Sequence, residues 1–236
     1  MPHSFDIRKA GGPQLDFLAP DIYFEFKKWS AMYDRPQNPL FIPEAAGGAQ
    51  GAASVYYAVG QHRAFGFAPF AIDRSSSEGD EDLTRSHDVL SQLAPLILDN
   101  QTRGRVAGVL LEELTPSQRL RLGDYTLNVL PGGPRRISPG EPVLPDAPRG
   151  QTPHGIFIAT APDEFYMAGG GLTITFSADT SRPPIVGLAT VEEGRFVEGR
   201  WIRGRVLAGG DTGQGNSVSL NAAATGILRV TVYRYR

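Results

Sequence analysis

Short apolar runs separated by turn residues fill the second half of the chain and restrict its fold more than any other feature. Glycine, proline, aspartate or asparagine interrupts the sequence between runs such as "DYTLNVLP", "GIFIATAP", "GLTITFSAD" and "GILRVTVYRYR". Polar residues separate Leu172, Ile174 and Phe176, and the C-terminal run alternates in the same way. Alternation with a period of two indicates strands that bury one face. Residues 104–236 are therefore predicted to form an antiparallel β-sandwich domain.

The first half of the chain follows a different pattern, in which apolar strands alternate with helices. Near-continuous apolar strands between helices are typical of parallel β/α units, which bury both faces of their sheet. We therefore expect an α/β domain over residues 1–103. Its predicted strands are 15–24, 40–45 and 64–73, and its predicted helices are 25–35, 50–63 and 82–101.

Composition and charge argue against several kinds of partner. The formal net charge is −2, whereas a nucleic-acid-binding protein would present a basic surface. The chain has no cysteine, which excludes disulfides and thiolate metal sites. No apolar run approaches the roughly 18 residues that span a membrane, and the N-terminal stretch lacks the apolar core of a signal peptide. The four histidines, His3, His62, His87 and His154, show no ligand spacing, so no metal site is expected.

Candidate functional residues follow the predicted strands of the first half. In parallel β/α units the functional side chains lie at the carboxyl ends of the strands. Glu44 ends the run "LFIPEA" and precedes the uncharged patch "AGGAQGAA". Asp21 and Tyr23 stand at the end of the preceding strand, and Phe70 and Asp73 at the end of the following one. We expect these five residues to gather at one edge of the sheet.

Each candidate also has a purely structural interpretation. Glu44 could serve as a charge at a helix N-terminus or as a member of a surface ion pair. Tyr23 could be a rim aromatic with a solvated hydroxyl. For Asp21 the sequence favours a helix cap over contact with a sugar hydroxyl. For Phe70 and Asp73 it favours a role in the core or in a loop.

Several motifs together resemble one enzyme family. The stretches "LDFLAPDIYFEFKKWSAMYDRPQNPLFIPEA" and "AVGQHRAFGFAPFAID" resemble the closing part of the catalytic barrel of β-galactosidase-like glycoside hydrolases of family 35, clan A. The later runs "LAPLI", "AGVLLEE", "APDEFYMAGGGLTITF" and "VEEGRFVEGRWIRGR" resemble the C-terminal β domain of the bacterial members. The resemblance implies the last three units of a (β/α)8 TIM barrel, followed by the β-sandwich.

The same resemblance implies a retaining mechanism on a β-galactoside or a related oligosaccharide, without a cofactor. Glu44 matches the nucleophile at the tip of the seventh barrel strand, and Tyr23 resembles the tyrosines that hydrogen-bond that nucleophile. The family's acid/base, a second glutamate preceded by asparagine on the fourth strand, has no counterpart here. A retaining enzyme needs both carboxyl groups, about 5–5.5 Å apart. The chain alone is therefore expected to be nearly inactive.

Two further expectations remain open. The β-sandwich could be the part that functions, as a non-catalytic carbohydrate-binding or structural module. An incomplete barrel would expose open strand edges, and such edges predict self-association through the first hundred residues.

Overall fold

The computed structural model describes residues 5–72, 80–112, 116–132, 152–179, 185–221 and 226–236. Its strands form a three-stranded, a six-stranded and a four-stranded sheet. The helices are α1 (Phe5–Gly11), α2 (Phe26–Tyr33), α3 (Gly48–His62), α4 (Asp80–Gln101) and the short 3-10 helix η2 (Gly209–Thr212). The strands are β1 (Asp21–Ile22), β2 (Phe41–Ala45), β3 (Gly66–Pro69), β4 (Val106–Leu110), β5 (Gln118–Leu122), β6 (Tyr125–Pro131), β7 (His154–Ala161), β8 (Glu164–Gly170), β9 (Leu172–Ala178), β10 (Ile185–Val197), β11 (Arg200–Leu207), β12 (Val218–Leu220) and β13 (Ile227–Tyr235).

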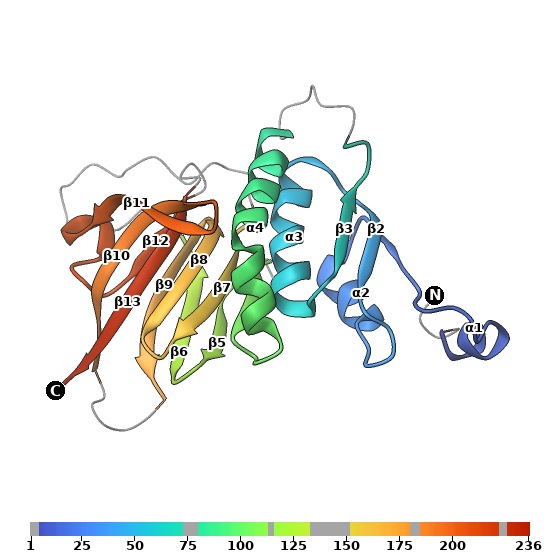
Figure 1. The fold of residues 1–236 in the computed structure, drawn as a ribbon, viewed down its shortest axis with the longest axis horizontal. Helices are drawn as coiled ribbons and strands as arrows, with labels where there is room; N and C mark the ends of the chain where they lie inside the picture. Colours follow the sequence, from blue (N-terminus) through green and yellow to red (C-terminus); the bar gives the residue numbers. More distant parts are fainter. Residues whose placement is uncertain (1–4, 73–79, 113–115, 133–151, 180–184, 222–225) are drawn as a thin grey trace.

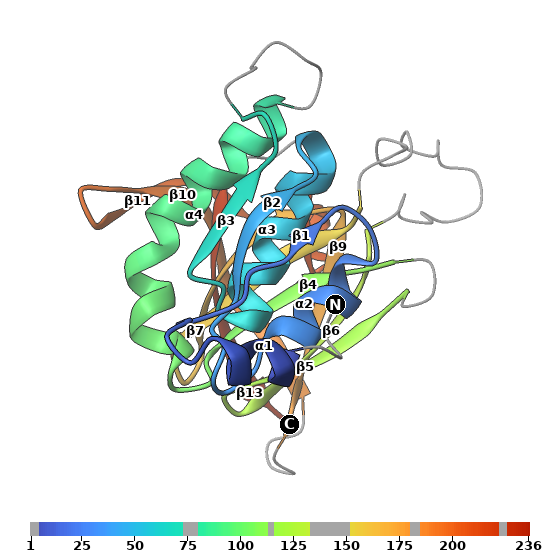
Figure 2. The same cartoon turned by 90° about the vertical axis from the view of Figure 1, so that its right-hand side faces the viewer.

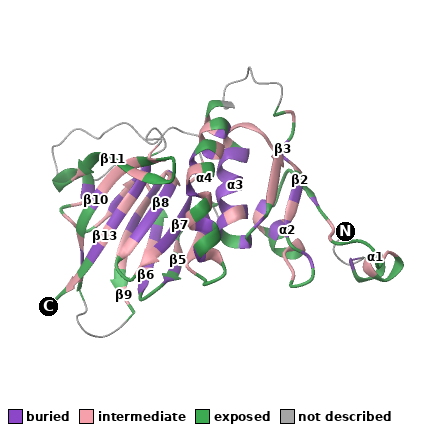
Figure 3. Ribbon diagram, viewed as in Figure 1, coloured by how far each residue is buried: buried purple, intermediate pink, exposed green. Residues whose placement is uncertain are grey.

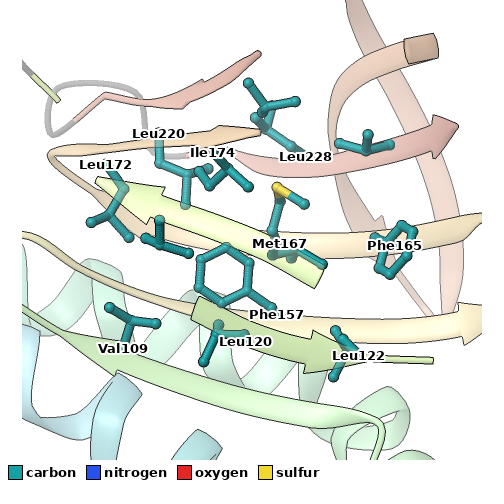
Figure 4. Close-up of a cluster of buried hydrophobic side chains, with 14 of the residues drawn as sticks. Val109, Leu120, Leu122, Phe157, Phe165, Met167, Leu172, Ile174, Leu220 and Leu228 are labelled. Atoms are coloured by element: carbon teal, nitrogen blue, oxygen red, sulfur yellow. The ribbon is translucent and has the colours of Figure 1, made fainter. Parts of the chain in front are cut away.

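Two antiparallel sheets make up the C-terminal part of the molecule (Figure 1). One has the strand order β11-β10-β13-β8-β7-β4 and the other the order β12-β9-β6-β5. Side chains from both sheets meet in one hydrophobic cluster, in which Phe157, Phe165 and Met167 are fully buried (Figure 4). Leu172 and Ile174 point into the same cluster, because alternate residues of a strand face the same side.

A layer of two helices covers the outer face of the six-stranded sheet (Figure 1). Val55 of α3 and Leu93 of α4 pack against Ile156 and Ile158 of β7. Residues 156–158 of β7 are buried on both faces, because Phe157 points the other way into the core between the sheets. This double burial explains the unbroken apolar run in "GIFIATA". Figure 3 shows that α3 is also buried along most of its length.

The three-stranded sheet lies on the other side of α3 and has the order β1-β2-β3, with all strands parallel (Figures 1 and 2). Ile22, Leu40 and Ile42 pack in one cluster with Ala58 of α3. The ladder places Asp21 opposite Glu44. Carboxyl ends of parallel strands meet at one edge, so the ends of β1 and β2 are brought together there.

The partial (β/α)8 barrel predicted from the sequence is wrong. The described residues are 45% strand and 28% helix, and most of the strands belong to antiparallel sheets. The parallel strands β1, β2 and β3 have 2, 5 and 4 residues. β1 and β3 are therefore much shorter than the strands predicted over residues 15–24 and 64–73. The helices α3 and α4 also do not form the outer layer of a barrel, because they lie against an antiparallel sheet.

Local contacts explain why the first predicted strand is so short. The side chain of Asn38 accepts a hydrogen bond from the Leu18 backbone N–H at 2.7 Å and donates one to the Leu18 carbonyl at 3.0 Å. Phe17 packs edge-on against Phe41 and Phe65, at ring-centroid distances of 5.9 Å and 5.2 Å. The apolar residues at this point therefore join an aromatic cluster and a side-chain bridge instead of a strand ladder.

The predicted division at residues 103 and 104 falls in the turn between α4 and β4. One hydrophobic cluster crosses this point, since it contains residues of α3 and α4 together with residues of β7, β8 and β13. The two-domain division stays a prediction. Self-association through the first hundred residues also stays a prediction, and within the described residues β1 and β3 are the edge strands of the parallel sheet.

Candidate functional site

The candidate site lies at the carboxyl end of the parallel sheet, where β1 and β2 lead into α2 and α3. The Tyr23 hydroxyl donates a hydrogen bond to Glu44 Oε1. This contact follows from the register of the ladder, because Asp21 is paired with Glu44 and Tyr23 comes two residues later. The structure therefore brings together the residues that the sequence singled out on β1 and β2.

Glu44 lies half-buried at this edge and accepts the hydrogen bond from the Tyr23 hydroxyl. Among the described residues it forms no ion pair, and its second carboxylate oxygen, Oε2, accepts no hydrogen bond. The N-cap of α3 is Gly47, so Glu44 is not the capping residue of that helix. The ion-pair interpretation of Glu44 is therefore not observed within the described residues. One oxygen is held by a neutral donor and the other is available to a ligand.

The hydrogen bond changes the titration of the tyrosine. The pKa of Tyr23 is raised to about 12, mainly by the hydrogen bond that its hydroxyl donates to the Glu44 carboxylate, with smaller contributions from desolvation and from the negative charges of Glu44 and Asp21. A tyrosine has an ordinary pKa of about 10. The phenol of Tyr23 therefore keeps its proton, and its capacity to donate, at neutral and moderately alkaline pH.

This shift can be measured directly. In protein labelled with carbon-13 at the tyrosine ring, the Tyr23 signal should titrate with a midpoint of about 12. In Glu44→Gln the midpoint should fall toward the ordinary value of about 10, because the amide carries no charge to oppose ionisation. The Tyr23→Phe spectrum assigns the signal, and Tyr56, whose pKa burial raises to about 12, serves as the unchanged internal control. A wild-type midpoint near 10 would contradict the hydrogen bond.

Exposed aromatic side chains border the same edge. Phe70, at the end of β3, is 55% exposed and meets the Tyr23 ring edge-on at 6.5 Å between centroids. Its backbone N–H donates to the Ala45 carbonyl at 2.8 Å, which holds it beside the end of β2. Of the core or loop role that the sequence favoured for Phe70, the structure shows a turn position outside the core. Phe24, which the sequence analysis did not single out, is 70% exposed next to Tyr23.

Asp21 and Asp73 are the two remaining acidic candidates. Asp21 is exposed and lies opposite Glu44 in the ladder. It is not the cap of α2, because Glu25 holds that position without a side-chain cap, so the favoured interpretation of Asp21 is wrong. Asp73 lies outside the described residues.

One residue that supports this edge was missed in the sequence. Gln50 of α3 donates from Nε2 to the Tyr23 carbonyl at 3.2 Å, which ties the tyrosine loop to the helix. Glu25 has a left-handed backbone with φ 48° and pairs with Lys28 at 2.8 Å. The signal for Gln50 was visible, because it is the single polar side chain in "AGGAQGAA".

The histidines are spread over separate elements. His62 contacts Asp34 at 2.8 Å between Nδ1 and Oδ2, and His154 Nδ1 lies 2.8 Å from the Thr152 carbonyl oxygen. His87 is on α4, and His3 lies outside the described residues. Within the described ranges, three or more potential metal ligands do not gather anywhere. No helix in those ranges has the length and apolar character needed to cross a membrane.

The fold and the site define a mostly antiparallel β protein with a two-helix layer and a carboxylate–tyrosine pair on a small parallel sheet. Residues 83–219 match a family described as a domain of unknown function, DUF5597. Because the match covers more than half of the chain, the protein belongs to this family. The matched residues begin in α4 and end in β12, so Tyr23 and Glu44 lie outside them. No curated protein matches the chain.

Proposed function

We propose that Glu44 is the catalytic nucleophile of a retaining, β-galactosidase-like glycoside hydrolase site. The observation that carries this proposal is the Tyr23 hydrogen bond to Glu44, which holds one carboxylate oxygen and leaves the other open. A nucleophilic carboxylate must be ionised and oriented toward the anomeric carbon. A neutral phenol does this without neutralising the charge. The resemblance of the sequence motifs to β-galactosidase-like enzymes is the basis for proposing a β-galactoside as the substrate.

The neighbouring side chains supply a surface that suits a sugar ring. Phe70, which contacts the Tyr23 ring, exposes an aromatic face against which the C–H groups of a hexose can pack. Asp21 is placed to accept hydrogen bonds from sugar hydroxyls, because it lies opposite Glu44 and is exposed. These groups bind and orient the substrate, while Glu44 performs the substitution.

The proposed site holds one half of the two-carboxylate mechanism. Among the described residues, Tyr23 is the side chain that donates a hydrogen bond to Glu44, and its pKa of about 12 makes it a poor acid. Acid–base assistance contributes about 10²–10⁴-fold to such reactions. Ordinary glycosides, whose leaving groups need a proton, should therefore be hydrolysed hardly at all by this chain.

A substrate with a leaving group that needs no proton tests the proposal. We expect a β-galactoside with a dinitrophenolate leaving group, and fluorine beside the anomeric carbon, to label the protein. A Glu44 oxygen attacks the anomeric carbon, the bond to dinitrophenolate breaks with its electron pair, and a glycosyl ester remains on Glu44. Peptide mapping by mass spectrometry should locate the ester.

Two variants make this labelling specific. Glu44→Gln should abolish the adduct. Glu25→Gln, at the exposed N-cap residue of α2, should keep it. An adduct on another residue, or no adduct in the wild type, would contradict the assignment of Glu44.

A second function, carbohydrate binding by the β-sandwich without catalysis, is supported by one observation. Tyr233 and Tyr235 on β13 are both exposed and stack at 5.4 Å between centroids. Retention on a galactan matrix with no ester on Glu44 would favour this second function over the first.

A further inference from the structure

The parallel sheet ends at β3 with an unpaired edge. Within the described ranges β3 pairs with β2 on one side and with no strand on the other. A free edge presents backbone N–H and C=O groups that can pair with another strand. Natural edges are usually protected by charged side chains, but Gly66, Phe67 and Ala68 carry none. Only Pro69, at the end of the strand, limits further pairing.

An apolar groove runs beside this edge. It has a volume of about 410 Å³ and lies between β3 and the helices α3 and α4. That volume is within the range of about 300–1,000 Å³ that is usual for ligand sites. Its apolar walls include Val59, Phe65, Phe67, Leu90, Ile97 and Leu98. Phe65 and Leu98 are 58% and 64% exposed, so the groove is open to solvent.

Two polar groups in the groove lack partners. Arg63 lies in its lining directly before β3, and in the described part of the chain it forms no ion pair. His87 also lines the groove, and its Nε2 is buried without a hydrogen-bond partner. Burial lowers the pKa of His87, so the ring is neutral and can make one hydrogen bond at Nε2. Because Arg63 is cationic, a ligand that fits should carry an anionic group near the start of β3.

We infer that the β3 edge and its groove bind an extended peptide strand from another polypeptide. An extended backbone is the ligand that satisfies an unpaired strand edge, and alternate side chains of that strand can enter the groove. Those alternate side chains are apolar, to match the walls of the groove, and an acidic residue lies opposite Arg63. A small apolar molecule could fill the groove but would leave the backbone edge unpaired.

The inference goes beyond the proposed glycosidase site and does not depend on it. Neither Glu44 nor Tyr23 lines the groove. Peptide binding should therefore be unchanged in Glu44→Gln, so failure of one proposal leaves the other standing.

A display library of random linear peptides of about ten residues, selected against the immobilised full chain, tests the inference. Enriched peptides should alternate apolar and polar residues and contain an acidic residue near one end. Their affinity should fall at least tenfold in Ala94→Arg, which fills the groove from α4. Backbone amides of β3 should exchange more slowly when such a peptide is bound.

Reversing the charge of Arg63 tests the inference without changing the packing of the groove walls. Arg63→Glu, at an exposed position, should shift the selection from acidic to basic peptides. Arg200→Glu, at another exposed position on β11, should leave the selection unchanged. Enriched peptides without alternation, or peptides that bind both groove variants as tightly as the wild type, would overturn the inference. Concentration-dependent dimerisation that Ala94→Arg removes would also overturn it, because the groove would then belong to a second copy.

Discussion

Gly108→Val is expected to lower the free energy of unfolding by about 3 kcal/mol or more, because the substitution separates α3 from the six-stranded sheet. A Cβ atom at Gly108 would lie 2.8 Å from the Gln61 backbone nitrogen and 2.8 Å from the Tyr56 carbonyl oxygen. Both atoms belong to the backbone of α3 and cannot rotate away. Gly60, which faces Gly108, is equally confined, since its own Cβ would lie 2.7 Å from the Gly108 Cα. Helix and strand thus touch backbone to backbone.

Displacing α3 would also disturb the rest of the molecule. The helix packs with α4 against the six-stranded sheet on one side and with the parallel sheet on the other. Moving it would open both clusters, which accounts for a cost at the upper end of the range for overpacking.

Urea unfolding monitored by circular dichroism measures this effect. The matched control is Gly11→Val at the end of α1, where a Cβ atom meets no other atom within 4 Å. The control should change the free energy of unfolding by no more than about 0.5 kcal/mol. Equal midpoints for the two variants would show that α3 does not depend on the close approach at Gly108.

Phe157→Ala is expected to destabilise the protein by about 3–5 kcal/mol. Phe157 is 0% exposed and lies among side chains from both antiparallel sheets, near Met167 and Leu120 (Figure 4). Truncation to alanine removes the buried ring and leaves a cavity that its neighbours on rigid strands cannot fill. Because Ile156 and Ile158 hold the opposite face of β7 against the helices, the strand cannot shift to close the space.

Thermal and urea unfolding should both report this loss, and the same substitution at an exposed phenylalanine is the control. Phe24→Ala, at a side chain that is 70% exposed, should change stability by no more than about 0.5 kcal/mol. A loss below about 1 kcal/mol for Phe157→Ala would mean that the two sheets do not share the tightly packed core described above.

The local pattern of residues predicted many of the helices and strands, although the runs interpreted as strands did not include β5, β8 and β12. Leu172, Ile174 and Phe176 alternate in the sequence and lie on one face of β9, two of them fully buried. The helices expected over 50–63 and 82–101 are observed as Gly48–His62 and Asp80–Gln101. These elements could be predicted because the period of burial within a helix or strand is written into neighbouring residues.

The pairing of candidate site residues was only partly visible. The position of Glu44 at the end of a strand followed from "LFIPEA", and that of Tyr23 from the preceding run. Their hydrogen bond depends on the register between β1 and β2, which neither run specifies alone. The expectation that Asp21 caps α2 was wrong for the same reason, because capping depends on how neighbouring elements meet.

The layer order of the molecule depended on contacts between residues far apart in the chain. An apolar strand next to a helix predicts a β/α unit, but it does not say what covers the other face of that helix. Here the facing glycines Gly60 and Gly108 allow α3 to lie directly on β4, so the helices cover an antiparallel sheet instead of closing a barrel. Composition and periodicity describe which face of an element avoids water, whereas steric fit between distant backbones selects the partner that covers it.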